Sequence, residues 1–192
     1  GSINSRLQGH PDMRKTPGIE ISGGSLGQGL SVVCGMAWGL RKMGRFSHVY
    51  CMIGDGESQE GQIWEAAMSA SQYRLDNLTA IMDYNKVQAK AYTYDEIGIE
   101  PVTKRWESFG WQTIEVDGHD MEQILNALYK ARWINRTGKP TIIIAHTVKG
   151  KGVDFMEFNP RWHTHAPTGE KAEETLEKLA ESYELKTGKR RT

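Results

Sequence analysis

A short acidic, glycine-rich segment between an apolar run and a helix-like pattern is the first candidate for chemistry in this chain. It reads GDGESQEG over residues 54–61 and follows the apolar run at residues 48–53. Acidic groups are favourable at a helix N-terminus because that end of a helix is electropositive. Glycines also let a bound group approach the backbone closely. Asp55, which stands between two glycines, therefore predicts a turn at which a metal ion holds a phosphate.

A second polar residue, Asn85, follows the next predicted strand along the chain. Consecutive parallel strands joined by a right-handed helical crossover typically have neighbouring ends. The Asp55 carboxylate, the Asn85 amide oxygen and a backbone carbonyl such as that of Val87 are hard oxygen donors, which suit Mg²⁺ or Ca²⁺. Diphosphate oxygens and water would complete the coordination. A Gly-Asp-Gly sequence alone is more often an ordinary turn, so the prediction depends on the pair.

The elements that must position these residues alternate between strands and helices. Apolar runs predict strands near residues 48–53, 77–83, 111–116 and 140–148. Helical patterns cover residues 28–43, 60–73, 101–109 and 120–135, the last with Asp120 as its cap. This alternation predicts an α/β fold, a parallel sheet with helices on both faces. Such sheets bind ligands beyond the carboxyl ends of their strands, where Asp55 and Asn85 fall.

The overall composition predicts a soluble protein. Lys and Arg number 24, as do Asp and Glu, and this formal net charge of zero argues against a nucleic-acid-binding surface. No apolar run is long enough to span a bilayer and no signal peptide is recognisable, so we expect no membrane partner and a cytoplasmic location. Cys34 and Cys51 lie in apolar segments and are expected to be buried, reduced thiols.

The 192 residues predict one main domain. We expect the α/β domain to cover residues 1–168, starting with a loop-rich stretch at residues 1–25. A C-terminal helix and basic tail would cover residues 169–192, because residues 170–184 read as an exposed amphipathic helix. The chain does not begin with Met, so we expect the N-terminal part of the domain to be missing.

Five segments, in order along the chain, resemble transketolase. They read SRLQGHPD (residues 5–12), GIEISGGSLGQGLS (18–31), GDGESQEGQIWEA (54–66), DNLTAIMDYNKVQ (76–88) and GWQTIEVDGHD (110–120). The likeness is in particular to the pyrophosphate-binding domain, which is a separate N-terminal subunit in split bacterial transketolases. It implies the thiamine diphosphate-binding fold and the cofactor thiamine diphosphate, held through Mg²⁺, or through Ca²⁺ or Mn²⁺ in its place.

The resemblance assigns the cofactor contacts at the acidic turn. Asp55 and Asn85 match the family's thiamine diphosphate motif, and with the Val87 carbonyl they are implied to hold the metal ion. The Gly56 amide is implied to contact the diphosphate.

The resemblance also assigns a loop that lines the cofactor, made of Gly24, Ser25 and Leu26. Leu26 is implied to lie against the thiazolium ring, and the Gly24 carbonyl to accept from the aminopyrimidine. Glycines in this loop would permit close backbone approach. Taken without the resemblance, the same segment could be a turn that enters a helix and binds nothing.

Two histidines match substrate-facing positions of the family, and both are implied to be catalytic. His10 is implied to hydrogen-bond a sugar hydroxyl and stabilise an oxyanion. His163, implied to lie near diphosphate and substrate, falls where the family reads Trp-His-Gly-Lys-Ala-Pro; this chain reads WHTHAP at residues 162–167. The changed positions leave His163 and His165 as alternatives, and we favour His163.

Glu60 and Glu65 are two further acidic residues in the segment at residues 54–66. In the family both lie at a subunit interface, with Glu60 near the partner's catalytic carboxylate in an acidic path between two active sites, so the resemblance counts Glu60 as catalytic. The alternative is that they are ordinary acidic groups favoured by the helix dipole.

Other histidines and tryptophans are expected to be structural: His48, His119, His146, Trp64, Trp106 and Trp111.

The implied reaction is transfer of a two-carbon ketol group from a ketose phosphate to an aldose phosphate. The family takes its catalytic glutamate from a pyrimidine-binding domain, and we find no match to that domain or to the family's Ser-Lys-Gly-His motif in this chain. We therefore expect the partner to be a pyrimidine-binding, C-terminal transketolase subunit. Self-association through this domain is also expected, with weak cofactor binding and little turnover when the partner is missing.

Two alternatives remain open at this point. The chain could belong to another thiamine diphosphate-dependent enzyme of ketose phosphates, such as 1-deoxyxylulose 5-phosphate synthase, which shares the Asp and Asn pair. It could instead be a non-catalytic subunit that keeps the fold for assembly.

Overall fold

The computed structural model describes residues 5–188, and its centre is a four-stranded parallel sheet. The strands lie in the order β1 (Val49–Gly54), β2 (Leu78–Tyr84), β4 (Thr141–His146) and β3 (Gln112–Asp117). Gly54 at the end of β1 pairs with Asp83 near the end of β2. The carboxyl ends of these two neighbouring strands therefore meet at one edge of the sheet.

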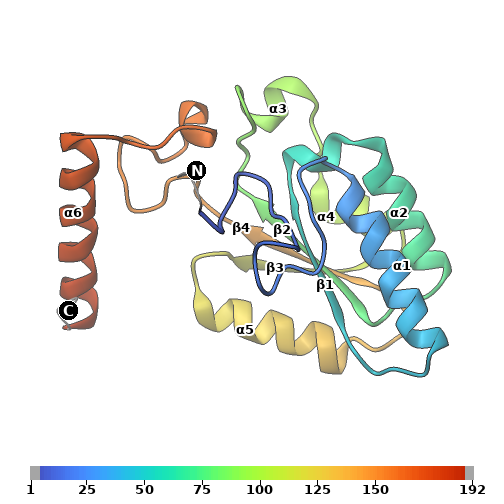
Figure 1. The fold of residues 1–192 in the computed structure, drawn as a ribbon. Helices are drawn as coiled ribbons and strands as arrows, with labels where there is room; N and C mark the ends of the chain where they lie inside the picture. The colour runs from blue at the N-terminus through green and yellow to red at the C-terminus, as the bar shows by residue number, and fades with distance from the viewer. Residues whose placement is uncertain (1–4, 189–192) are drawn as a thin grey trace.

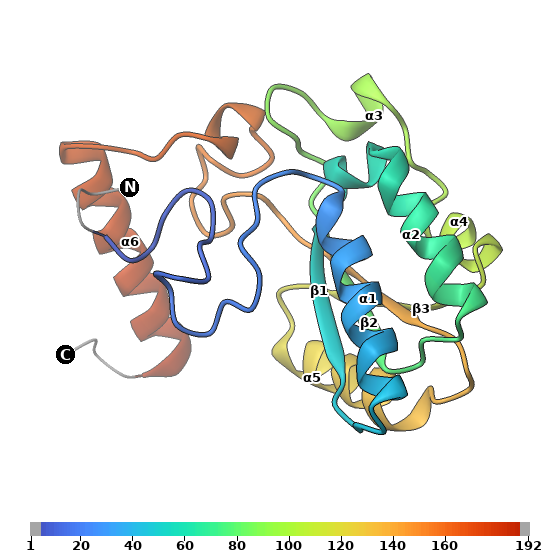
Figure 2. The ribbon, with the colours of Figure 1, turned by 45° about the vertical axis from the view of Figure 1, so that its right-hand side comes forward.

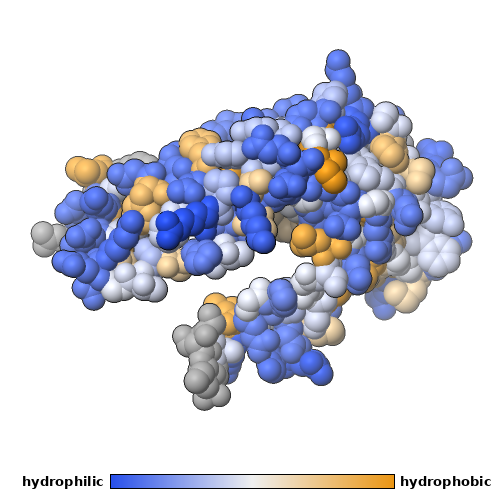
Figure 3. Space-filling view, turned by 90° about the horizontal axis from the view of Figure 1, so that it is seen from above, coloured by the Kyte–Doolittle hydropathy of each residue, from blue (hydrophilic) through white to orange (hydrophobic). Residues whose placement is uncertain are grey.

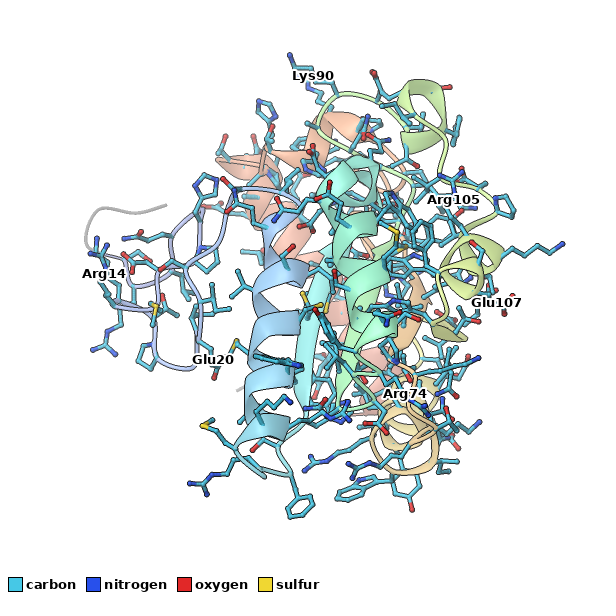
Figure 4. All side chains as sticks on the ribbon, turned by 90° about the vertical axis from the view of Figure 1, so that its right-hand side faces the viewer. Arg14, Glu20, Arg74, Lys90, Arg105 and Glu107 are labelled. Atoms are coloured by element: carbon cyan, nitrogen blue, oxygen red, sulfur yellow. The ribbon has the colours of Figure 1, made fainter. Side chains whose placement is uncertain are left out.

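Helices cover both faces of the sheet, which confirms the predicted fold class (Figure 1). The helices of the described chain are α1 (Gln28–Lys42), α2 (Gly61–Gln72), α3 (Thr93–Glu96), α4 (Val102–Ser108), α5 (Met121–Tyr129) and α6 (Glu170–Thr187), with short helices η1 (Gly56–Gln59), η2 (Lys130–Ile134) and η3 (Pro160–His163). α1 and α2 lie side by side over one face, and α5 covers the other (Figures 1 and 4).

Two buried apolar clusters hold these layers together. The larger lies between the sheet and α1, α2 and α4, where Leu30, Ile63 and Trp106 are fully buried. The smaller lies under α5 and includes Ile143 of β4. The first five residues of β4 are all buried, as expected for a parallel strand covered on both faces.

The predicted structural aromatic residues and histidines agree with the structure. Trp106 packs against Trp64 and Trp111 with ring centroids 5.1 and 5.0 Å apart. The three structural histidines each have a hydrogen-bond partner: His48 with the Thr79 hydroxyl, His119 with the Val148 amide and His146 with the Glu115 carboxylate. Cys34 and Cys51 are free, buried thiols, and burial raises their pKa to about 11 and about 12.

Most element boundaries fall within a few residues of the predicted ones. Asp120 caps α5 as predicted, accepting from the amides of Glu122 and Gln123 at 2.9 and 3.2 Å. The helix expected at residues 60–73 is preceded by η1, and the helix expected to reach residue 135 ends in the π-helical η2. Between β2 and α4 the chain also forms the short helix α3.

The N-terminal loop and α6 lie beside the sheet rather than within its layers (Figure 2). α6 contacts the segment after β4 through Lys171, whose Nζ lies 3.9 Å from the centroid of the Phe155 ring. The predicted domain boundary at residue 168 stays a prediction, as does the basic tail at residues 189–191, which lies outside the described residues. Within residues 5–188, no helix has the length and apolar character needed to cross a membrane.

Candidate functional site

Asp55 lies directly after β1 and is 2% exposed. Its Oδ1 accepts from the Gly56 amide at 2.7 Å, and its Oδ2 accepts from the amide of Lys86. Lys86 follows β2 and adopts a left-handed conformation with φ of 64°, which is uncommon for a residue other than glycine. Such backbone conformations persist where the surrounding structure enforces them, often at functional sites. The Asp55 carboxylate therefore joins the ends of β1 and β2.

Asn85 is buried beside this contact, and its amide orientation is fixed by its neighbours. Its Nδ2 donates to Asp83 Oδ2 at 2.8 Å, and its Oδ1 accepts from the Val87 amide at 2.8 Å. An ionised carboxylate only accepts hydrogen bonds, so Asp83 sets which side of the Asn85 amide carries the oxygen. That oxygen keeps a second lone pair for a ligand. The Asn85–Lys86 peptide is thus held against Asp55, as the sequence predicted for the pair.

Burial dominates the electrostatics of Asp55. It raises the pKa of this carboxyl from its ordinary 3.8 to about 6, although the Lys86 and Gly56 amides and the charge of Lys149 act in the opposite direction. The nearby carboxylate of Asp83 raises the pKa further. Desolvation disfavours an isolated buried carboxylate, whereas a cation placed beside it favours the charged form. A cation bound at this site would therefore favour the charged form of Asp55.

The chemistry of the donor set fits a divalent metal with a diphosphate ligand. Asp55 and Asn85 offer oxygen atoms, and within residues 5–188 no hydrogen bond is donated to the carbonyl oxygen of the buried Val87. Three oxygen donors suit Mg²⁺ or Ca²⁺, which take six or more. No group of three or more His, Cys, Asp or Glu side chains in the described part of the chain is placed to hold a metal. A metal at this turn would thus depend on oxygen atoms from its ligand.

Gly56 occupies a tight position at the same turn. A Cβ on this residue would lie 3.0 Å from the Gln88 side chain, so the glycine allows the two strand ends to approach. The Gly56 amide donates to Asp55 in this structure. To contact a diphosphate, the Gly56 amide would therefore have to donate to the diphosphate instead of Asp55, or to both.

The loop of Gly24, Ser25 and Leu26 leads into α1 and is exposed, with Leu26 62% exposed. Glu57 connects this loop to the turn at Asp55: its Oε1 accepts from the Gly27 amide at 2.8 Å and its Oε2 from the Gly54 amide at 3.0 Å. The role of Glu57 was not predicted from the sequence. The sequence shows only that Glu57 lies two residues after Asp55, which is also where an ordinary acidic residue at the start of a helix would lie.

His10 lies against the same loop. A Cβ on Gly24, whose φ is 135°, would come within 2.8 Å of His10 Cγ, so glycine is needed for this close approach. The loop is further tied to the N-terminal segment by the Gly23 amide, which donates to the Pro11 carbonyl at 3.1 Å. The structure therefore brings His10 beside the loop that was predicted to line the cofactor.

His163 and His165 differ in their surroundings. Desolvation, followed by the charge of Lys149, lowers the pKa of His163, and Asp83 acts in the opposite direction, although the side chains of both histidines are exposed. His163 therefore lies near the charged groups at the strand ends. His165 instead approaches its own loop, with Nδ1 3.0 Å from the Arg161 carbonyl oxygen. The choice of His163 as the residue that faces the site stays a prediction.

Lys149 places a positive charge near Asp55 and His163. It follows β4, and its charge influences the pKa of both Asp55 and His163. Lys90, by contrast, points outward at the top of the molecule (Figure 4). Lys149 is thus a cation that can help to neutralise an anion beside Asp55.

Glu60 and Glu65 are both exposed, at the start of α2 and within it. Glu60 packs against Gly27, since a Cβ on Gly27 would lie 2.8 Å from Glu60 Cβ. Their exposure leaves both acids available to a partner surface. The interface role of these two residues stays a prediction.

The face that carries the strand ends is mainly hydrophilic and is hollowed near its middle (Figure 3). A separate cavity of about 810 Å³ lies between the N-terminal loop and the α1 and β1 side of the sheet. Ser25 lines that cavity, but Asp55 and Asn85 do not.

Comparison with known families and structures gives a consistent result. Residues 2–186 match the family model described as transketolase, thiamine diphosphate binding domain. Among solved structures, the transketolase of Campylobacter jejuni superposes with a TM-score of 0.83 at 33% sequence identity, covering 94% of this chain and 28% of that one.

Several relatives share a large part of this sequence. A subunit of the apulose-4-phosphate transketolase of Actinobacillus succinogenes is 43% identical over 92% of this chain and 63% of its own length. A 6-deoxy-6-sulfo-D-fructose transketolase subunit of Clostridium sp. is 46% identical over 79% of this chain and 54% of its own length. The chain therefore spans less than two thirds of the length of these relatives.

Proposed function

The chain belongs to the family of transketolase thiamine diphosphate binding domains, and from this premise we propose that it forms the diphosphate-binding half of a transketolase active site. The reaction would transfer a two-carbon ketol group from a ketose phosphate to an aldose phosphate. The observation that carries this proposal is the contact between the Asp55 carboxylate and the Lys86 amide. That contact holds Asp55 beside Asn85 and Val87, the three oxygen donors of the expected metal site.

In this proposal the chain's own residues bind and orient the cofactor. Asp55, Asn85 and the Val87 carbonyl hold Mg²⁺, or Ca²⁺ or Mn²⁺ in its place, and Lys149 adds positive charge beside the diphosphate. Bound thiamine diphosphate supplies the carbon nucleophile and the electron sink for cleavage of a ketose. The protein's contribution is to fix the orientation of the cofactor and the charge around it.

Two histidines would act on the substrate. His10, beside the Gly24 loop, would donate a hydrogen bond to a sugar hydroxyl and stabilise developing negative charge on oxygen. Desolvation, followed by the charge of Lys149, lowers the pKa of His163, which favours its neutral imidazole. A neutral imidazole can accept a proton from a hydroxyl group and return it later.

The remaining parts of the site would come from a partner. Relatives named as subunits of apulose-4-phosphate transketolase support a division of the enzyme into two polypeptides. We propose that the partner is a pyrimidine-binding subunit, that the chain self-associates through the surface that carries Glu60, and that its location is cytoplasmic. The substrates would be sugar phosphates or related acidic sugars, since two relatives are named for apulose 4-phosphate and 6-deoxy-6-sulfo-D-fructose.

Titration calorimetry of the purified chain tests the binding step. We expect thiamine diphosphate to bind only with Mg²⁺ present, and thiamine without phosphate to bind at least about a hundredfold more weakly, because the metal and Lys149 recognise the diphosphate. Equal affinity for thiamine and thiamine diphosphate would contradict the proposal. The absence of any binding would favour a non-catalytic role in assembly.

Ketol transfer with and without a pyrimidine-binding subunit tests the second step. We expect turnover only in the mixture, because the family takes its catalytic glutamate from the pyrimidine-binding domain, to which no segment of this sequence was matched. Full turnover by the chain alone would show that its site is complete and would remove the need for a partner.

A further inference from the structure

We propose that Glu57 is a positioning residue that sets the distance between the two cofactor-binding segments of this chain, the loop at residues 24–26 and the turn at residues 54–56. This inference rests on the proposed function, because it assigns those segments to one ligand. The carboxylate accepts from the Gly27 amide with one oxygen and from the Gly54 amide with the other, at 2.8 and 3.0 Å. One side chain thus bonds the residue after the loop and the first residue of the turn.

The link matters because the loop has few other supports of its own. Residues 24–26 are exposed, and within the described part of the chain no hydrogen bond joins them to any element other than α1. Gly27, which ends the loop, is the N-cap of α1 and has no side chain to cap that helix. The Gly27 amide is among the N-terminal donors that a helix cannot satisfy internally. Glu57 satisfies it from a different element.

Packing around Gly27 makes the link stiff. Gly27 is buried and has a φ of 84°, and a Cβ there would lie 2.8 Å from Glu60 Cβ. The backbone of Gly27 is therefore pressed against the start of α2 while Glu57 holds its amide. Charge-assisted hydrogen bonds to a carboxylate are stronger than neutral ones. The loop consequently cannot move away from the Asp55 turn without breaking a strong bond.

A fixed separation would pre-organise the site for a ligand with two recognised ends. The turn would bind the metal and diphosphate, and the loop would bind the ring system at the other end of the cofactor. If Glu57 holds the two segments in register, loss of its bonds should weaken binding of the whole cofactor while leaving diphosphate binding intact. A residue that only stabilised the fold would not separate these two affinities.

Substitution Glu57→Gln tests this with little change in volume. The amide has one oxygen acceptor, and its NH₂ group would face an amide donor, so one of the two bonds is lost. Calorimetry would compare Mg²⁺ with thiamine diphosphate against Mg²⁺ with inorganic diphosphate. We expect about tenfold weaker binding of thiamine diphosphate, as for loss of one hydrogen bond to a charged group, and diphosphate affinity within about twofold. Glu122→Gln, on α5, is the matched control and should change neither affinity.

Two results would overturn the inference. Equal weakening of both ligands would mean that Glu57 supports only the Asp55 turn, and no change in either would mean that the link does not position the loop. Amide hydrogen exchange of the ligand-free chain gives an independent decision. We expect Gly27 to exchange at least about tenfold faster in Glu57→Gln, with β2 and β4 unchanged.

This exchange measurement separates the inference from the proposed function. Failure of the unsubstituted chain to bind thiamine diphosphate would contradict the proposed function alone. Unchanged exchange at Gly27 in Glu57→Gln would overturn the positioning role of Glu57 whether or not the chain binds the cofactor.

Discussion

The two ends of β1 each carry a titratable side chain whose pKa is shifted by burial. At the start of the strand, burial lowers the pKa of His48 from its ordinary 6.5 to about 4. At the end, burial raises the pKa of Asp55 from 3.8 to about 6. Both shifts have one cause, because low-polarity surroundings favour the neutral form of an acid and of a base. By this criterion alone, the two residues would be equal candidates for a functional site.

Their neighbours distinguish them. His48 hydrogen-bonds to the Thr79 hydroxyl and packs against the Tyr50 ring, with ring centroids 4.8 Å apart. These contacts within the fold account for its burial without a ligand. Asp55 faces backbone amides from the glycine turn and from the left-handed Lys86, with the charge of Lys149 nearby. A shifted pKa therefore indicates burial. Only the surrounding donors, cations and close backbone approach indicate a place for a ligand.

The largest expected effect comes from removing the acid at the end of β1. Asp55→Asn should weaken binding of thiamine diphosphate with Mg²⁺ by about a thousandfold, because the metal loses its one charged protein ligand in a buried site. His48→Gln should leave this affinity within about twofold. Calorimetry on the folded variants measures both.

Two outcomes for this pair of variants would contradict the distinction between His48 and Asp55. If His48→Gln weakened cofactor binding as much as Asp55→Asn, the two ends of β1 would be functionally coupled. Retained binding in Asp55→Asn would mean that the metal site lies elsewhere.

The pH dependence of stability should separate the same two residues. The folded pKa of His48 lies below its unfolded value, so its contribution to stability is lost as pH falls from 6.5 to 4. The folded pKa of Asp55 lies above its unfolded value, so in the metal-free chain stability is lost as pH rises from about 4 to about 6. Each effect is at most about 3 kcal/mol, and in the overlapping window they oppose one another.

Single substitutions expose each contribution. With EDTA present, urea unfolding of Asp55→Asn should show stability rising between about pH 4.5 and 6.5, because only the His48 contribution remains of the two. His48→Gln should show a fall over the same range, relative to Asp55→Asn. Other titrating groups are common to both variants and cancel in the difference. Parallel pH profiles for the two variants would show that these residues do not carry the shifts.

The smallest effect concerns the glycines that shape the site. Gly27→Ala should lower the free energy of unfolding by about 1–2 kcal/mol, because its φ of 84° strains other residues and its Cβ would meet Glu60. Gly39→Ala in α1, where a Cβ meets nothing within 4 Å, should raise the free energy by about 1 kcal/mol. Urea denaturation measures both, and a change of the same sign in the two variants would contradict the assigned backbone strain.

Much of the fold could be predicted from local sequence. Strands and helices follow from hydrophobic periodicity and from caps such as Asp120, which act over a few residues. The placement of Asp55 near Asn85 also followed, because consecutive parallel strands place their ends together. The π-helical end of α5 and the short α3 were not predicted, since neither changes the local pattern strongly.

The details of the site were harder to predict because they depend on contacts between residues that are far apart in the sequence. Glu57 and Lys149 act on groups about 30 to 100 residues away in the chain, and strand order alone does not indicate which side chains near the strand ends meet. Sequence alone likewise does not distinguish His163 from His165, because their roles depend on the residues around them in the fold. The roles of all these residues in binding and catalysis stay predictions until the ligand is measured.

The left-handed Lys86 has a consequence for how such sites vary between proteins. Its contact with Asp55 is made by the main chain, and so is the proposed metal bond of Val87. A change of the side chain at position 86 alone would not remove the amide that Asp55 accepts, and glycine there would relax the backbone. Proline at position 86 would remove the amide hydrogen that Asp55 accepts and fix φ at a negative value. Sequence comparison by side-chain identity therefore understates how much of this site two proteins share.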